Sequence, residues 1–144
     1  MLPTSARTVP EWALWAIVLN FFWEVAQLRF YAFAPTVGRW ERVWDVVHCT
    51  AGDGLIALVS YAAAALVTRA PDWPARRPKL GLTVVLCVGL AWTAWSEWQN
   101  VYVNGAWAYA ASMPTILGIG LLPMLQWLAL PPLVLLAVRY RLRA

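Results

Sequence analysis

The sequence predicts an all-α, polytopic membrane protein: a four-helix transmembrane bundle that forms one domain over residues 1–144. Two observations support this prediction. Of the 144 residues, 62% are hydrophobic and only 12% are charged, which is more apolar surface than a soluble domain of this length can hide. In addition, four stretches approach or exceed the roughly 20 apolar residues that cross a bilayer. The expected spans are residues 12–31, 44–67, 80–102 and 114–138.

The first expected span, 12–31, is too long for the apolar region of a cleaved signal peptide and has Glu24 in its middle. We therefore expect it to be retained as a helix. A charge at that depth costs about 2.5–3.5 kcal/mol on insertion scales, so Glu24 should face the interior of the bundle. Tryptophans prefer the membrane interfaces. Those expected in the interfacial belts are Trp12, Trp40, Trp44 and Trp73.

Basic residues are distributed unevenly between the connections. If the amino terminus is cytoplasmic, that side holds eight of the eleven arginines and lysines, and the opposite side holds three. The positive-inside rule then places both termini in the cytoplasm, with the proline-rich segment 68–79 as the main cytoplasmic loop. We expect an integral protein of a bacterial inner membrane. The net charge of +4 reflects this topology and predicts no nucleic-acid partner.

Polar side chains form two helical stripes within the apolar spans. Both stripes follow an i, i+4, i+7, i+11 spacing, which puts each set on one helix face. The first comprises Asn20, Glu24, Gln27 and Tyr31, and the second comprises Thr93, Glu97, Asn100 and Asn104. Because spans one and three point the same way, a duplicated two-helix unit would explain the repetition.

Further polar residues are expected at the same depth as these stripes. His48 and Asp53 fall in the outer half of the second span, and Gln126 falls near the middle of the fourth. Such convergence favours a functional site, although buried polar groups also hold helices together. Tryptophans beside the stripes are candidates to line a cavity; they are Trp23, Trp95 and Trp98. The spacing of His48 and Asp53 matches no metal motif, so no metal is expected.

Buried carboxyl groups among aromatic walls suit acid chemistry on an apolar substrate. Burial disfavours the charged form of a carboxyl group, so a buried glutamic acid can keep its proton and donate it. Protonation of an alkene or epoxide creates a carbocation, which tryptophan faces stabilise. A second carboxylate or a histidine can then remove a proton. This outline fits an isoprenoid cyclase without a cofactor, and its expected catalytic residues are Glu24, Glu97, His48 and Asp53.

Two segments resemble known cyclases. The segment 97–127 resembles the pattern of acid, Gly-x-Trp-x-aromatic, Gly-Ile and Leu-Pro in the small heterodimeric-type lycopene cyclases. It matches through Glu97, Gly105, Trp107, Tyr109, Gly118, Ile119 and Pro123. Those enzymes continue with paired glutamates, where this sequence has Leu125 and Gln126. The stretch Asn20 to Glu24, "NFFWE", is similar to the Asn-x-x-Trp-Glu motif of fungal integral-membrane terpenoid cyclases.

The resemblance implies carotenoid-type or terpenoid cyclisation of an apolar isoprenoid within the bilayer. It leaves room for a homodimer or a partner membrane subunit, because four helices enclose little volume for a long polyene. The expected substrate-binding residues are Asn20, Trp23, Gln27, Tyr31, Trp95, Trp98, Asn100, Trp107, Tyr109 and Gln126.

Two other classes of function stay open. One is a non-catalytic protein that binds a pigment, quinone or lipid, with the two glutamates as hydrogen-bonding anchors. The other is a small transporter or proton-path subunit. A transporter needs a continuous polar route, whereas the inner halves of the expected spans hold almost no ionisable groups. We therefore rank the cyclase first, the binding protein second and the transporter third.

Overall fold

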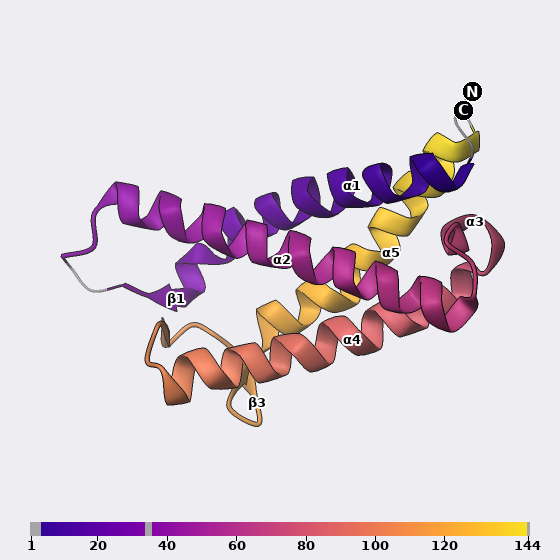
Figure 1. Ribbon diagram of the computed structural model, residues 1–144. Helices are drawn as coiled ribbons and strands as arrows, with labels where there is room; N and C mark the ends of the chain where they lie inside the picture. Colours follow the sequence, from indigo (N-terminus) through magenta and orange to yellow (C-terminus); the bar gives the residue numbers. More distant parts are fainter. Residues whose placement is uncertain (1–3, 34–35, 144) are drawn as a thin grey trace.

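The computed structural model of the chain describes residues 4–33 and 36–143. Four long helices dominate it (Figure 1): α1 (Thr4–Gln27), α2 (Arg39–Thr68), α4 (Pro78–Trp98) and α5 (Leu121–Arg143). Helix α1 packs against α2 and α5, and α4 packs against the same two helices from the opposite corner. Neighbouring helices are antiparallel, so the described part of the chain forms an up-and-down bundle.

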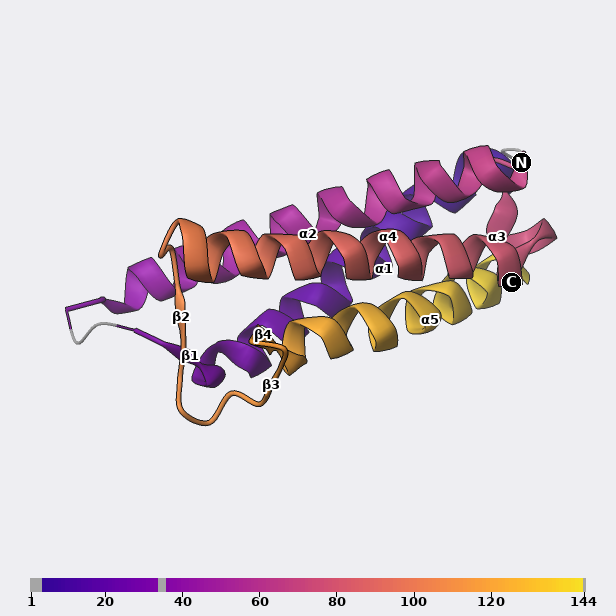
Figure 2. The same cartoon turned by 90° about the horizontal axis from the view of Figure 1, so that it is seen from below.

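The two ends of the bundle differ in structure. The chain termini lie together at one end, close to the short helix α3 (Trp73–Arg76), and the short strands lie at the other (Figures 1 and 2). We call these the terminal end and the strand end. Strand β1 (Tyr31–Ala32) pairs antiparallel with β2 (Ala108–Tyr109), with Tyr31 opposite Tyr109. Strand β3 (Thr115–Ile116) forms a hairpin with β4 (Ile119–Gly120).

The predicted all-α fold is confirmed. Within the described residues, three helices are long and apolar enough to cross a membrane: Arg39–Thr68, Pro78–Val103 and Leu121–Leu142. Helix α1 is not among them, because Asn20, Glu24 and Gln27 lower its apolar character. The fourth crossing, by α1, therefore stays a prediction.

The bounds of the first and last helices differ from the expected spans. Helix α1 begins near the amino terminus and ends at Gln27, where a 3₁₀ turn, Leu28–Phe30, leads into β1. Tyr31 is consequently a strand residue and not the last member of a helical stripe. The fourth span begins at Leu121 and not at residue 114, because the β3–β4 hairpin occupies the segment before it.

A π-helical turn ends the second stripe early. Residues Gln99–Val103 form this turn, in which the Asn104 backbone N–H donates to the Gln99 carbonyl oxygen over 2.8 Å. The wider turn changes the helical phase, so Asn104 is exposed and lies outside the stripe. Such turns are frequent at functional sites, and this one begins two residues after Glu97.

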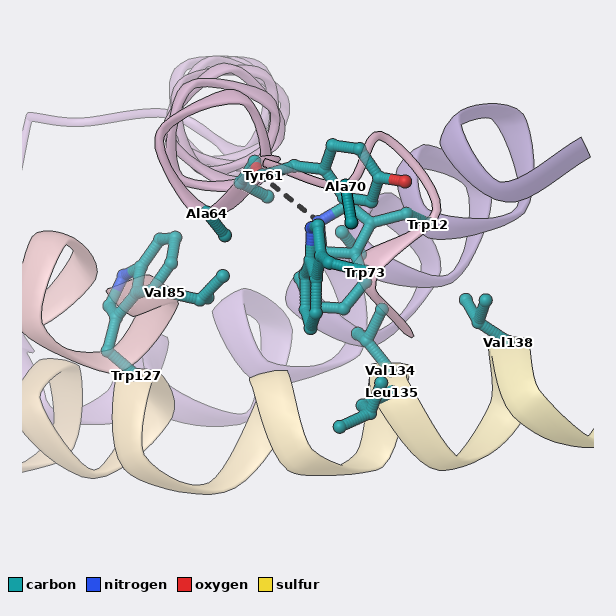
Figure 3. Packing of buried hydrophobic residues seen from close by; sticks show 12 residues of the cluster. Trp12, Tyr61, Ala64, Ala70, Trp73, Val85, Trp127, Val134, Leu135 and Val138 are labelled. Carbon is teal, nitrogen blue, oxygen red and sulfur yellow. Dashed lines mark hydrogen bonds between the residues drawn. The ribbon is translucent and has the colours of Figure 1, made fainter. Parts of the chain in front are cut away.

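The terminal end contains a packed aromatic cluster. Trp12, Tyr61 and Trp73 have ring centroids 5.1–5.6 Å apart, and the Trp12 indole N–H donates to the Ala57 carbonyl over 3.2 Å (Figure 3). Trp12 and Trp73 are only 1% and 0% exposed. Their prediction as interfacial residues was wrong, because α3 folds Trp73 back into the core. Trp40 and Trp44 are exposed and remain compatible with an interfacial belt.

Some buried positions of the pair α1–α2 recur on the pair α4–α5 at an offset of 73 residues, which is the distance from Glu24 to Glu97, whereas the counterparts of Val46, Ser60, Ala64 and Thr68 are not buried. On α1 the buried stripe is Thr8, Trp12, Ala16, Asn20 and Glu24. On α4 it is Gly81, Val85, Gly89, Thr93 and Glu97. On α2 the positions Thr50, Gly54, Ala57 and Tyr61 are buried, and their α5 counterparts Pro123, Trp127, Leu130 and Val134 are buried as well.

Candidate functional site

A cavity of about 660 Å³ lies towards the strand end of the bundle. This volume is within the range of about 300–1,000 Å³ that is typical of small-molecule sites. The last turns of α1 and α4, the first halves of α2 and α5, and the β1–β2 region surround it. Its polar lining includes Glu24, Gln27, Tyr31, Asp45, His48, Cys49, Asp53, Thr93, Ser96, Glu97, Asn100 and Gln126. Its aromatic lining includes Phe33, Trp92, Trp107 and Trp127.

Gln126 is the centre of a hydrogen-bond network on one wall of this cavity. Its side-chain nitrogen, Nε2, donates to Asn20 Oδ1 over 2.7 Å, to Asp53 Oδ2 over 2.7 Å and to Glu24 Oε1 over 3.2 Å. The side chain is 2% exposed. One amide from α5 therefore ties together polar groups from α1 and α2, and it brings the carboxyl groups of Glu24 and Asp53 to the same point.

Gln27 orients Glu24 from the next turn of α1. Its Nε2 donates to Glu24 Oε1 over 2.7 Å and to Gln126 Oε1 over 3.4 Å. Its own carbonyl oxygen accepts the indole N–H of Trp23 over 3.0 Å. Trp23 was expected to line the cavity, but it is not among the described lining residues and instead fixes the orientation of the Gln27 amide.

Glu97 forms a second polar centre. Its Oε2 accepts the Tyr109 hydroxyl over 2.6 Å, and its Oε1 accepts the Tyr31 hydroxyl over 3.3 Å. The Gly120 backbone N–H donates to the Tyr109 oxygen over 2.9 Å. Pairing of β1 with β2 places the two tyrosines side by side. Burial, followed by the hydrogen bond to Glu97, raises the pKa of Tyr109, so this phenol keeps its proton at neutral pH.

Two other predicted residues line the cavity without joining either centre. His48 stacks near Trp44, with ring centroids 6.4 Å apart, and among the described residues it makes no hydrogen bond to a carboxyl group. Asn100 donates to the Ser96 carbonyl over 2.9 Å. The expected neighbours of Glu24 were His48 and either Glu97 or Asn100, whereas its hydrogen bonds are with Gln27 and Gln126, and Gln126 also donates to Asp53.

Trp95 and Trp98 do not line the cavity, contrary to expectation. They are 53% and 49% exposed on the outside of the bundle. Their phase on α4 differs from that of Thr93 and Glu97, so adjacency in sequence did not bring them to the same face. Trp107 does line the cavity. Tyr109 is not among the described lining residues, but it donates a hydrogen bond to Glu97, which is.

Trp92, Trp127 and Cys49 line the cavity but were not predicted. Trp92 and Ser96 have the same four-residue spacing as Thr93 and Glu97 and lie one position before them. This spacing could have predicted that Trp92 lines the cavity from α4. The sequence around Trp127 did not predict its place, because the Trp127 ring packs against Gly89 of a different helix.

No lysine or arginine is among the described lining residues, so the acidic groups of the cavity face no permanent cation. Within the described ranges, no group of three or more histidine, cysteine, aspartate or glutamate residues is suited to a metal ion. The arrangement suits proton transfer and binding of apolar or cationic groups. The sequence matches no protein-family model, no curated protein and no protein of solved structure.

Proposed function

We propose that this chain is a membrane-embedded enzyme that cyclises or isomerises an apolar isoprenoid by proton transfer. The observation that carries the proposal is that Glu24, Asp53 and Glu97, from three different helices, line one aromatic-walled cavity. A carboxyl group in such surroundings is costly. Three of them around a space of ligand size favour chemistry over helix packing.

The proposal includes a bundle that crosses the membrane four times. Helix α1 has 24 residues and lies along α2 and α5. At about 1.5 Å per residue it is roughly 36 Å long, which exceeds the ~30 Å hydrocarbon core. Its polar stripe faces the interior, where Glu24 is 8% exposed. We place both termini in the cytoplasm of a bacterium and the strand end at the outer surface of the inner membrane.

The proposed reaction needs no cofactor. A carboxylic acid donates a proton to one carbon of an alkene, and the π electron pair forms the new C–H bond. The neighbouring carbon becomes a carbocation, which a second alkene of the same chain attacks to close a ring. Loss of a proton from an adjacent C–H to a carboxylate restores a double bond. Because substrate and product are isomers, the net change in protons and electrons is zero.

The aromatic lining suits the cationic intermediate. Trp92, Trp107 and Trp127 border the cavity from α4, the loop before β2 and α5. A cation near a tryptophan face gains about 0.5–2 kcal/mol, more where water is excluded. An apolar substrate dissolved in the bilayer would approach from the membrane.

Non-catalytic binding of a quinone, pigment or lipid is the second candidate. It is favoured because the side-chain amides of Gln27 and Gln126 both donate hydrogen bonds to Glu24. Networks of this kind also occur where polar side chains only hold helices together. In that case glutamine at position 24 should keep ligand binding intact, whereas the enzymatic proposal requires a carboxylic acid there.

The first experiment identifies the ligand and then the reaction. The protein is purified in detergent, extracted with organic solvent, and the co-purified lipids are identified by mass spectrometry. It is then incubated in D₂O with acyclic polyprenyl alcohols and their terminal epoxides. With the polyprenyl alcohols, the enzymatic proposal predicts an isomeric cyclic product that carries one deuterium on carbon. With the epoxides, which are protonated on oxygen, it predicts an isomeric cyclic alcohol without deuterium on carbon. An isoprenoid in the extract without any conversion would favour binding, and phospholipid alone without conversion would refute both.

Matched variants separate chemistry from packing. Glu24→Gln should abolish deuterium incorporation. Glu11→Gln is the control, because Glu11 lies on the same helix, outside the cavity lining, and pairs with Arg141 over 3.6 Å. Full turnover by Glu24→Gln would rule out proton donation by this residue.

A further inference from the structure

We propose that the cavity holds its acid and its base at separate places: Glu24 and Asp53 share one proton, whereas Glu97 is an ionised carboxylate fixed by Tyr109. The catalytic roles rest on the proposed function, with the Glu24–Asp53 pair as proton donor and Glu97 as proton acceptor. The protonation states themselves rest only on the hydrogen-bond geometry. Tyr109 is a positioning residue, since it lies behind Glu97 and outside the cavity lining.

Tyr109 donates to Glu97 and accepts from the backbone. The Gly120 amide can only donate, and it donates to the Tyr109 oxygen over 2.9 Å. The Tyr109 hydroxyl donates its hydrogen to Glu97 Oε2, 2.6 Å away. A distance of about 2.5–2.7 Å is typical of a hydroxyl that donates to a charged carboxylate. The Tyr31 hydroxyl donates to the other oxygen, so both oxygens of Glu97 act as acceptors.

The surroundings of Glu24 and Asp53 require a proton. Both carboxyl groups accept from the same Gln126 nitrogen, at 3.2 and 2.7 Å, so they lie next to each other. Two adjacent carboxyl groups away from water do not both ionise, so one of them keeps a proton. The only other described donors to Glu24 are neutral amides, which cannot balance two adjacent negative charges away from water.

The remaining titratable groups of the cavity do not change this assignment. From α2 these are Asp45, His48 and Cys49, and from β1 there is Tyr31. None of the first three forms a hydrogen bond with Glu24, Asp53 or Glu97 among the described residues. Tyr31 donates to Glu97, which adds to the stabilisation of its charge.

The matching of buried positions supports a division of roles. Glu24 and Glu97 occupy equivalent places on α1 and α4 at the offset of 73 residues, and Asp53 and Gln126 are equivalent on α2 and α5 at the same offset. We infer a duplicated two-helix unit in which the two glutamates have acquired different partners. One meets a second carboxyl group, and the other meets two phenols.

Infrared difference spectroscopy on the detergent-purified protein tests the assignment without any substrate. In H₂O and D₂O at neutral pH, the wild type should show the carbonyl stretch of a protonated carboxylic acid. This band should vanish in Glu24→Gln/Asp53→Asn and persist in Glu97→Gln, which should instead lose a carboxylate band. Loss of the protonated band in Glu97→Gln, or its absence from the wild type, would overturn the proposal.

Tyr109→Phe tests the positioning role. Removal of the 2.6 Å donor should convert the Glu97 carboxylate band into a protonated one, and Tyr31→Phe should do so to a smaller extent because its bond is longer, at 3.3 Å. An unchanged carboxylate band in Tyr109→Phe would refute the role of this residue. The outcome is independent of turnover, so a failure of the proposed reaction and a failure of this assignment are distinguishable.

Discussion

Gly89→Ala should destabilise the bundle, because a tryptophan ring occupies the space that the added methyl group needs. A Cβ atom at position 89 would lie within 2.7 Å of two ring carbons of Trp127 and closer still to a third. Contacts of 3.4 Å or more are ordinary, so the ring would have to retreat by roughly 1 Å or more. Trp127 is 3% exposed and belongs to the buried core, which leaves it little room to move (Figure 3).

The magnitude follows from two opposing effects. Overpacking of a close-packed core costs about 1–3 kcal/mol, and the enclosed ring of Trp127 places the cost in the upper half of that range. Alanine gains back about 0.5–1 kcal/mol as the better helix former. We expect a net loss of about 2 kcal/mol, which corresponds to a fall of roughly 4–8 °C in the melting temperature of a chain of this size.

Thermal unfolding of the purified protein in detergent, followed by circular dichroism, measures the effect. Gly52→Ala is the matched control, because Gly52 borders the open space of the cavity and nothing lies within 4 Å of the added atom; it should gain about 0.5–1 kcal/mol. In the background of Trp127→Leu, the cost of Gly89→Ala should disappear. A cost that persists without the tryptophan ring, or wild-type stability of Gly89→Ala, would show that this contact does not limit the packing.

Three further outcomes are expected. Glu24→Leu should be about 1–3 kcal/mol less stable than Glu24→Gln by urea unfolding, because it leaves buried amides without an acceptor; equal stability would show that water replaces the carboxyl group. Arg141→Ala should cost less than about 1 kcal/mol in the same assay, because its pair with Glu11 is 57% exposed on the arginine side. Reporter fusions should place both termini in the cytoplasm, and a tag in residues 105–107 should react with an impermeant label from outside. Labelling of residues 74–77 instead would invert the topology.

The four long helices and the buried positions of Asn20, Glu24, Thr93 and Glu97 followed from sequence periodicity, because apolar runs and 3.6-residue spacing act locally. The short helix α3 was not predicted. The helix ends did not follow. The apolar run through Tyr31 gave no sign of the break after Gln27, since the break depends on pairing of β1 with a strand 77 residues later. The same holds for the fourth helix, whose predicted first turns form the β3–β4 hairpin.

The candidate site was predictable by depth but not by partner. Glu24, Asp53, Glu97 and Gln126 were expected in the same half of the bilayer, and all four line one cavity. Which of them touch depends on the rotation of each helix about its axis, and that rotation is set by contacts across the bundle. The hydrogen bonds from Gln126 to Asn20 on α1 and Asp53 on α2 are such contacts across the bundle, so the sequence of one helix alone does not predict them.

The terminal end of the bundle consists mainly of apolar packing, whereas the strand end contains the polar candidate site. At the terminal end, tryptophan rings lie against one another and against glycines, with Trp73 over Gly81 and Trp127 over Gly89. At the strand end, carboxyl groups and amides replace that dry packing, and each buried polar group there reduces stability unless a partner satisfies it. Trp127 belongs to both parts, because its ring packs on α4 and also borders the cavity next to Gln126. A substitution at Gly89 should therefore alter the cavity wall without changing any polar group, which makes the packing of α4 against α5 a determinant of the shape of the site.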